Sequence, residues 1–452
     1  MSIKNTKKIK YADLWGLRKE KYDWLDNHDF SDTKWQELDP KSPYYFFVPK
    51  DDAGWEQYQN FWKITDIFPV NSVGIVTARD DLTIGWTENE IWNRVLTFAN
   101  YEPEQARAFY QLGKDARDWK VELAQKDLHD SGLKRELVVP IAYRPFDIRY
   151  TYYTGHSRGF HCMPRPEVMR NMIKPNLALN IGRSGIVANV DGWDVVFVTD
   201  SIPDLNLFRR GGNQVLPLYS YSRDDEQQGL FQQISHATNP NLNPEIWDYL
   251  GDQYVATHPE DIFNYIYAVL YSNTYRQKYA EFLKVDFPRI PFTQNYQLFQ
   301  KLAELGRGLV DLHLLRSPEL DNPGTKCHGT GSNLVGIAKF IGIDEAVEYH
   351  DIQIETFWPE SGEKPKYKSA GIVMLNDEKQ FFGPVPREVW DYHIGGYQVL
   401  HKWLKDRKGR YLANEEIKTY CRIATALKST IEIQKEIDNL YPKVEESLIN
   451  NA

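Results

Sequence analysis

The hydrophobic pattern of this chain changes its period part-way along the sequence, and that change limits the folds it can adopt. Residues 137–221 carry short β-prone runs such as WDVVFVTDSI, with glycines at the turns between them. From Pro259 onward, apolar residues recur at helical spacing, and the last long segment keeps this pattern for about 25 residues. We therefore predict an α+β fold, with a β-rich first half and a more helical second half.

A chain of 452 residues is long enough for two or three folding units. We predict a linker or docking helix over residues 1–39, a β-rich subdomain with a helical insert over 40–258, and a helical subdomain with a small β insertion over 259–452. The aromatic run SPYYFFVP (42–49) predicts a strand. The run TENEIWNRVL predicts a helix that begins with a capping box of Thr87 and Glu90.

The charge and the cysteine content describe an ordinary intracellular protein. The formal net charge is -9, so no general attraction to polyanions can be assumed and any nucleic-acid surface has to be a local patch. Three scattered cysteines indicate a reducing compartment, and His161–Cys162 and Cys327–His328 lack the second ligand spacing of a metal site. We expect a cytoplasmic protein with no metal site and no membrane association, because no apolar run reaches the roughly 20 residues that span a bilayer.

One such local patch is predicted in Ile141–Lys174, where arginines alternate with aromatic rings. Guanidinium groups suit phosphates and guanine edges, and rings suit bases, so this mixture is typical of a nucleic-acid surface. The same alternation also fits a half-buried strand whose arginines are solvated at its edge. The candidate contacts here are Arg144, Arg149, Tyr150, Tyr152, Tyr153, Arg158, Arg165 and Arg170.

Two further places carry candidate contacts. Arg79 and Asp80 follow a short β-prone run, and a strand in this position delivers charged side chains to the loop at its end. A surface ion pair of Arg79 with Asp80 or Asp81 is the simpler explanation of these charges. The segment HKWLKDRKGR contributes Lys402, Lys405, Arg407 and Arg410, either as phosphate contacts or as cations that complement a helix dipole.

Catalytic signatures are missing from the sequence. It contains no nucleophile elbow, no H-E-x-x-H pair and no phosphate-binding loop, and the glycine-rich CHGTGSNLVG matches neither nucleotide motif. Asp80 with Asp81, or Asp191 with Asp194, are possible acid/base pairs, but turn-forming or surface aspartates explain them more simply.

Three long segments resemble one known family. They are IAYRPFDIRYTYYTG (141–155), FNYIYAVLYSNTYRQKYAEFLKVDFPRIPF (263–292) and HIGGYQVLHKWLKDRKGR (393–410). They resemble the C-terminal target-recognition region of Type ISP restriction-modification enzymes and related N6-adenine DNA methyltransferases, and YADLWGLRKEKYDWL resembles the stretch that links this region to a methyltransferase domain. The methyltransferase, helicase and nuclease motifs of that family are absent here.

The resemblance implies a non-enzymatic specificity part of a phage-defence system that binds duplex DNA sequence-specifically. It would present an adenine to a partner methyltransferase domain or subunit. The chain itself would need no cofactor, whereas the partner would use S-adenosylmethionine. Two other functions stay open from the residues: a carbohydrate-active enzyme with an aspartate pair, and a scaffold that docks a methyltransferase through Trp15, Trp24 and the final helix.

Overall fold

The computed structural model describes residues 8–42, 44–51, 54–182, 192–209, 212–222, 238–342, 370–376 and 380–449. The chain forms two compact units, Met1–Trp55 and Glu56–Ala452. In the first unit, β1 (Ile9–Tyr11) pairs antiparallel with β2 (Gln36–Leu38), and α1 (Arg18–Asn27) lies between them in sequence. None of the described residues of this unit is buried, so they form no core of their own.

The strand predicted at 42–49 is wrong. The described residues of that run form turns, bends and irregular backbone. Tyr45 has a φ of 48°, which interrupts an extended backbone, and none of the strands in the described part of the chain pairs with this run. A β-prone composition alone does not form a strand without a partner for its backbone groups.

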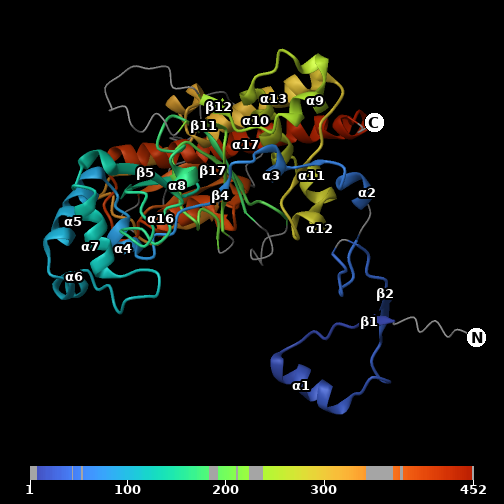
Figure 1. Ribbon diagram of the computed structural model, residues 1–452, viewed down its shortest axis with the longest axis horizontal. Helices are drawn as coiled ribbons and strands as arrows, with labels where there is room; N and C mark the ends of the chain where they lie inside the picture. Colours follow the sequence, from blue (N-terminus) through green and yellow to red (C-terminus); the bar gives the residue numbers. More distant parts are fainter. Residues whose placement is uncertain are drawn as a thin grey trace, which may run out of the picture. The chain divides into compact units, whose positions relative to one another are not determined.

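The first elements of the second unit are short. They are α2 (Trp55–Tyr58), whose first residue is the last residue of the first unit, β3 (Trp62–Lys63), α3 (Ile64–Ile67), β4 (Ser72–Val73) and α4 (Asp80–Thr83). Three longer helices follow and pack side by side at one end of this unit (Figure 1): α5 (Glu88–Asn100), α6 (Pro103–Phe109) and α7 (Val121–Asp130). These helices lie in the part of the sequence where a helical insert is predicted.

The predicted helix start at Thr87 is confirmed in part. Thr87 Oγ1 accepts a hydrogen bond from the Glu90 backbone N–H at 3.1 Å, as in a capping box. Glu90 Oε2, however, accepts from the backbone N–H of Trp86 at 2.7 Å, one residue before the predicted partner. This bond fixes the backbone of Trp86, which matters for the site below.

Two sheets form the β-rich part that follows. The three-stranded sheet has the order β6-β5-β9, with β5 (Val138–Arg144), β6 (Asp147–Tyr152) and β9 (Ile202–Pro203). The four-stranded sheet has the order β4-β10-β7-β8, with β7 (Ala178–Ile181), β8 (Val196–Thr199) and β10 (Gln214–Pro217). Pairing is antiparallel except between β5 and β9, where Ile141 lies opposite Ile202. Buried residues of β5, β7, β9 and β10 share one core, and Tyr152 of β6 belongs to a second core with α5 and α7.

The helical part of the unit is built around α10 (Pro259–Tyr271), α13 (Tyr296–His313) and α17 (Asn414–Glu446), which pack against one another (Figure 1). Helices α10 and α13 come very close, because a Cβ atom at Gly306 would lie 1.9 Å from the Asn264 carbonyl oxygen. Helix α17 has 33 residues, longer than the predicted 25 or so, and is the long C-terminal element that the apolar repeat indicates.

A third sheet and several short elements complete the described chain. The sheet has the order β14-β17-β16-β15 and lies in the helical part of the sequence, where a small β insertion is predicted; residues 343–369 and 377–379 lie outside the described residues. Its strands are β14 (Lys326–His328), β15 (Lys339–Gly342), β16 (Ala370–Met374) and β17 (Phe381–Pro386). The remaining strands are β11 (Tyr219–Tyr221), β12 (Thr238–Pro240), β13 (Arg289–Ile290), β18 (His393–Ile394) and β19 (Tyr397–Gln398). The remaining helices are α8 (Pro166–Met169), α9 (Glu245–Leu250), α11 (Asn273–Lys278), α12 (Ala280–Leu283), α15 (Arg387–Trp390) and α16 (Val399–Lys405), with 3-10 turns at Arg135–Leu137, Asp252–Tyr254 and Pro318–Asp321.

The mixture of helices and small sheets confirms the α+β class. None of the helices in the described part of the chain has both the length and the apolar character that crossing a bilayer requires.

Candidate functional site

The two basic segments predicted to form a surface meet inside the second unit. Asp147, at the start of β6, is 2% exposed and accepts hydrogen bonds from both segments. Its Oδ2 accepts from Arg149 Nη2 at 2.8 Å, and its Oδ1 accepts from Arg407 Nη2 at 2.8 Å. Burial would raise the pKa of Asp147, but Arg407 and Arg149 more than offset this and hold the pKa below its ordinary value. We call Asp147, Arg149, Asp406, Arg407 and Glu416 the buried ionic cluster, since Asp406 and Glu416 complete its charges at 3.6 Å from Arg149 and 3.4 Å from Arg407.

The indole of Trp86 lies against three guanidinium groups of this region. The guanidinium carbon of Arg149 is 3.9 Å from a Trp86 ring centroid, that of Arg410 is 3.8 Å away and that of Arg407 is 4.8 Å away. Cation–π contacts of this kind hold charged side chains in place while they lose water. Because the backbone of Trp86 is fixed at the start of α5, the ring connects the helical insert to β6 and to the segment around α16.

Arg144 is engaged in a second buried ion pair. Its Nη1 donates to Asp204 Oδ1 at 2.9 Å, and its guanidinium lies 3.8 Å from the ring centroid of Tyr143. The Arg144 residue is 9% exposed. Burial raises the pKa of Asp204 to about 6, against the opposing effect of Arg144.

The predicted tyrosines differ in their surroundings. Tyr152 and Tyr153 are buried, with the Tyr152 hydroxyl in contact with Ser131 Oγ at 2.8 Å and the Tyr153 hydroxyl donating to the Pro164 carbonyl at 2.9 Å. Tyr150 is half-buried against the core of the helical insert. Their rings therefore support the strand, as the half-buried-strand alternative expects.

The remaining residues of the second basic segment are closer to solvent. Lys402 is half-buried and pairs with Asp406 at 2.5 Å, and Arg410 pairs with Glu416 at 3.2 Å. Lys405 is exposed. Fewer cations of this segment are therefore available for phosphate contacts than its composition suggests.

A second set of arginines remains open to solvent and surrounds a cavity of about 320 Å³, which we call the arginine cleft. It is lined by Arg117, Asp118, Ser157, Arg158, Cys162, Met163, Arg165, Pro166 and Glu167. The side chains of Arg117 and Arg158 are 89% and 69% exposed, and both face Asp118, at 2.7 Å and 4.0 Å. Burial raises the pKa of the Cys162 thiol, and its Sγ lies 3.3 Å from the Asp118 carbonyl oxygen.

Backbone pairing holds the cleft beside Arg79. Val76 and Met163 exchange N–H···O hydrogen bonds of 2.9 and 3.1 Å, so the segment that leads to Arg79 runs antiparallel to the segment that leads to Arg165. The Arg79 guanidinium lies 4.8 Å from the ring centroid of buried Trp119, and its Nη2 donates to the Lys114 carbonyl at 3.1 Å.

Arg79 and Arg165 are half-buried, and no carboxylate in the described part of the chain pairs with either of them. Within the described ranges, the Nε of each is buried without a hydrogen-bond acceptor, and Arg165 Nη2 donates to the Met163 sulfur at 3.2 Å. A partly desolvated guanidinium without a counter-charge is electrostatically costly, and an incoming anion relieves that cost. These two side chains are therefore the strongest candidates for phosphate contacts. Arg170 is half-buried beyond α8.

Asp80 does not form a catalytic carboxylate pair. Its Oδ2 accepts a hydrogen bond from the Tyr143 hydroxyl at 2.8 Å, and its Oδ1 accepts from Thr77. Asp81, next to it in α4, is exposed, and consecutive helix residues do not face each other. Asp191 lies outside the described residues, and the pKa of Asp194 is raised by burial. No three His, Cys, Asp or Glu side chains gather as a metal site in the described ranges.

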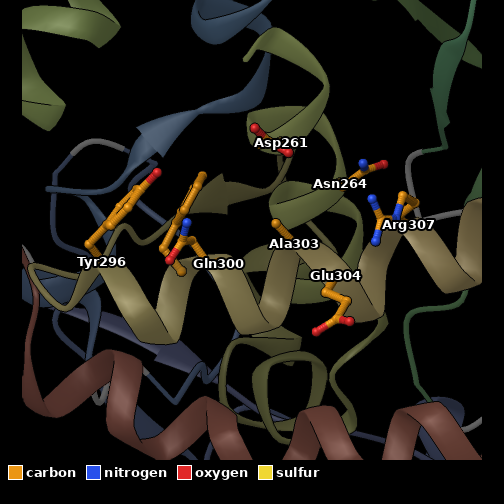
Figure 2. A pocket seen from close by; sticks show the side chains of 8 residues that line it. Asp261, Asn264, Tyr296, Gln300, Ala303, Glu304 and Arg307 are labelled. Atoms are coloured by element: carbon orange, nitrogen blue, oxygen red, sulfur yellow. The ribbon is translucent and has the colours of Figure 1, made fainter. Parts of the chain in front are cut away.

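A second cavity, of about 240 Å³, lies between α10 and α13 (Figure 2). Asp261 and Asn264 of α10 face Tyr296, Gln300, Ala303, Glu304 and Arg307 of α13. The Asp261 carboxylate is already used as a helix cap, since it accepts from the His258 backbone N–H at 3.0 Å. Because this cavity is lined by side chains of both charges, it has no preference for a polyanion such as DNA.

The sequence prediction missed Arg117, Asp127, His156 and Ser157. Asp127, in α7, holds the loop that carries His156, Ser157 and Arg158, and Arg117 lines the cleft from the segment before α7. The two glycines in TGHSRGF were an available signal, because glycines four positions apart around polar residues indicate a tight loop.

Comparisons with known proteins identify the fold. A family model described as the Type ISP C-terminal specificity domain matches residues 66–436. No curated protein is similar in sequence to this chain.

Solved structures share the architecture at low sequence identity. The DrdV–DNA complex has a TM-score of 0.63 and 20% identity, covering 92% of this chain and 42% of that one. A nuclease-deletion mutant of the Type ISP restriction-modification enzyme LlaGI, in complex with a DNA substrate mimic, has a TM-score of 0.60 and 18% identity. The match covers 96% of this chain and 39% of that one. The ATP-dependent Type ISP restriction-modification enzyme LlaBIII, bound to DNA, has a TM-score of 0.61 and 16% identity. The match covers 90% of this chain and 25% of that one. The chain therefore spans less than half of the length of each of these proteins.

Proposed function

Because this chain belongs to the Type ISP C-terminal specificity domain family, we propose that it recognises a target sequence in duplex DNA for a restriction-modification enzyme. The proteins of the same fold named above were solved with DNA or a DNA substrate mimic. The observation that carries the proposal is the state of Arg79 and Arg165, two half-buried guanidinium groups with no carboxylate partner in the described ranges.

The arrangement separates arginines that build the fold from arginines that are available to DNA. Arg144, Arg149 and Arg407 have buried carboxylate partners, so moving them to a phosphate would break ion pairs in the interior. Arg79, Arg158 and Arg165 line or flank the arginine cleft and can approach DNA without such a loss. Phosphate contacts from this set would orient the duplex, and base contacts would specify it.

The reaction on the bound DNA belongs, in this proposal, to another part of the enzyme. We assign no catalytic role to this chain and no cofactor, and we expect the partner methyltransferase to use S-adenosylmethionine for N6-adenine methylation. The first unit supports a partner of this kind, because Trp15 is 84% exposed, Phe47 is 64% exposed and none of its described residues is buried. Exposed aromatic side chains in one small unit are typical of a protein-contact surface.

A binding measurement over a salt series tests the DNA proposal. Fluorescence anisotropy is recorded with labelled random duplexes and with duplexes enriched by selection, from 50 to about 200 mM salt. We expect log affinity to fall linearly with log salt concentration, and the enriched duplexes to bind more tightly at every salt concentration. Binding that shows neither salt dependence nor sequence preference contradicts the proposal.

A further inference from the structure

The loop Gly155–Gly159 is closed at its base by a single buried oxygen atom. Asp127 Oδ2 accepts one hydrogen bond from Thr154 Oγ1 at 2.8 Å and another from the Phe160 backbone N–H at 2.8 Å, so it holds the residues on both sides of the loop. Asp127 is 6% exposed and lies in α7, which packs in the core of the helical insert. The loop therefore has a fixed base although its tip lies at the surface.

Further contacts fix the backbone of this loop. The His156 backbone N–H donates to Thr154 Oγ1 at 3.2 Å, and the Arg158 backbone N–H donates to the Cys162 carbonyl at 2.9 Å. Only glycine fits at position 159, where a Cβ atom would lie 2.2 Å from Asp127 Oδ2. Arg158 has a φ of 59°, in the left-handed region that side-chain-bearing residues adopt when surrounding contacts impose it.

The side chains at the tip, in contrast, are available. His156, Ser157 and Arg158 are all exposed, and each carries hydrogen-bonding groups. The ion pair of Arg158 is weak, because its Nη2 lies 4.0 Å from Asp118 in a solvent-exposed position. A rigid backbone that presents three polar side chains to solvent meets the requirement for reading base edges, since specific base contacts need donors and acceptors held at defined positions.

We propose that the Gly155–Gly159 loop reads base edges in the major groove, that Arg158 donates to a guanine, and that Asp127 is the residue that positions the loop. This inference rests on the proposed DNA-binding function and assigns roles within it. Arg158 extends from an exposed loop tip, and Arg guanidinium matches the O6 and N7 acceptors of guanine with two hydrogen bonds. Arg79 and Arg165 are half-buried beside the loop and take the phosphate contacts that orient the duplex.

The test is selection of duplexes from a randomised library with the full 452-residue chain and its variants, followed by measurement of affinity for the selected sequence and its single-base-pair changes. We expect the wild type to enrich one sequence. Arg158→Gln should lose at least about tenfold discrimination at one G·C pair and keep the preference at the other positions. Arg158→Lys should lose discrimination at the same pair, since an ammonium group lacks the paired donors. As the control, Lys301→Gln on α13 removes one exposed positive charge and should change neither sequence nor affinity.

The outcomes separate this inference from the function on which it rests. If Arg158→Gln enriches the wild-type sequence with unchanged discrimination, the reading role of the loop is overturned while DNA recognition stands. If Arg158→Gln lowers affinity equally for all sequences, Arg158 contacts a phosphate, and the reading role is overturned as well. If the wild type enriches no sequence, the proposed function itself is contradicted.

Thr154 tests the positioning role of Asp127 with little disturbance of the core. Thr154→Val keeps the shape of the side chain but removes the hydroxyl, which donates to Asp127 Oδ2 and accepts from the His156 backbone N–H. We expect about threefold to tenfold weaker discrimination at the Arg158-dependent pair, with a thermal unfolding midpoint close to that of the wild type. Thr154→Ser retains the hydroxyl and should restore discrimination. Full discrimination in Thr154→Val overturns the positioning role.

Discussion

Asp147 and Arg407 are 260 positions apart in the sequence, and their side chains form a buried ion pair with an Oδ1–Nη2 distance of 2.8 Å. The pair joins β6 to the end of α16, and Arg149 binds the other oxygen of the same carboxylate. Two segments that look alike as DNA-binding surfaces are therefore held against each other in the interior. The positive charges of Arg149 and Arg407 are thus used to stabilise the fold and are not free to contact DNA.

Asp147→Asn should destabilise the protein by roughly 3–5 kcal/mol, because the buried guanidinium group of Arg407 and the half-buried one of Arg149 lose their shared carboxylate. Urea denaturation followed by circular dichroism measures the free energy of unfolding. Glu415→Gln is the control, since it removes one partner of the exposed Lys418–Glu415 pair, and it should leave the unfolding midpoint unchanged. Equal effects of the two variants would show that the buried ionic cluster does not stabilise the fold.

Arg79→Gln and Arg165→Gln should each weaken DNA binding about tenfold, because each removes a charged donor that has no carboxylate partner in the described part of the chain. Arg165→Gln should leave stability close to that of the wild type, whereas Arg79→Gln also loses the hydrogen bond to the Lys114 carbonyl and the contact with Trp119. If each contacts one phosphate, each variant should also reduce the slope of log affinity against log salt concentration by about 1. The slope is measured by anisotropy over a salt series. Unchanged slopes in both variants would exclude these side chains as phosphate contacts.

Acid should destabilise the protein through His161. The imidazole is fully buried, and burial lowers its pKa to about 4. Thr151 Oγ1 donates to the Thr83 carbonyl and lies 2.8 Å from His161 Nε2, so Nε2 carries the proton, and a second proton on Nδ1 would find no hydrogen-bond acceptor. An unfolded histidine titrates near pH 6.5, so the stability that the neutral ring provides is present above pH 6.5 and is lost as the pH falls toward 4.

The size of this effect follows from the two pKa values. At pH 5 the loss from His161 amounts to about 2 kcal/mol, and buried His313, with a pKa lowered to about 3 by burial, adds a similar loss. Burial raises the pKa of Asp204, which works in the opposite direction. Comparing His161→Phe with the wild type cancels these other groups. Between pH 7 and pH 5, the variant should lose about 2 kcal/mol less free energy of unfolding than the wild type, and an identical loss would contradict the assignment.

Two glycines of α13 should respond in opposite ways to alanine. At Gly306 an added Cβ would lie 1.9 Å from the Asn264 carbonyl oxygen, so Gly306→Ala has to separate α10 from α13, at a cost of about 2–4 kcal/mol. At Gly308 the nearest atom outside the helix is Ile433 Cδ1 at 3.4 Å. Gly308→Ala should therefore be neutral or stabilise the helix by up to about 1 kcal/mol. Thermal unfolding of both variants measures the difference, and similar midpoints would mean that the two helices are not in tight backbone contact.

Local patterns in the sequence predicted much of the fold. Three helices were predicted from the spacing of nearby residues, and all three are present: residues 259–271, the helix that begins after Thr87 and the long helix near the end of the chain. Such helices are predictable because their signals lie within a few turns of one another. The aromatic run at 42–49 shows the limit of such patterns, because whether a β-prone run becomes a strand depends on a distant partner.

The candidate site was less predictable, for a related reason. Composition does not distinguish Arg144, whose partner Asp204 lies 60 positions away, from Arg158, which lies on an exposed loop. Changing Arg144 or Arg149 to glutamate would place a carboxylate beside Asp204 or Asp147 and unfold part of the chain, so loss of DNA binding in those variants would not identify a DNA contact. The candidates from the sequence include Arg79, Arg158 and Arg165, which the proposed function uses, but the sequence could not separate them from the other arginines.

The single-oxygen closure of the Gly155–Gly159 loop also bears on how such a protein changes over evolutionary time. The bonds that hold the loop use the backbone of Phe160, the hydroxyl of Thr154 and a carboxylate of α7, and none uses the side chains of residues 156–158. Substitutions at these three positions leave those bonds in place, so selection can alter the tip independently of the interior. New target preferences then become accessible by one or a few point mutations, without a compensating change in the core.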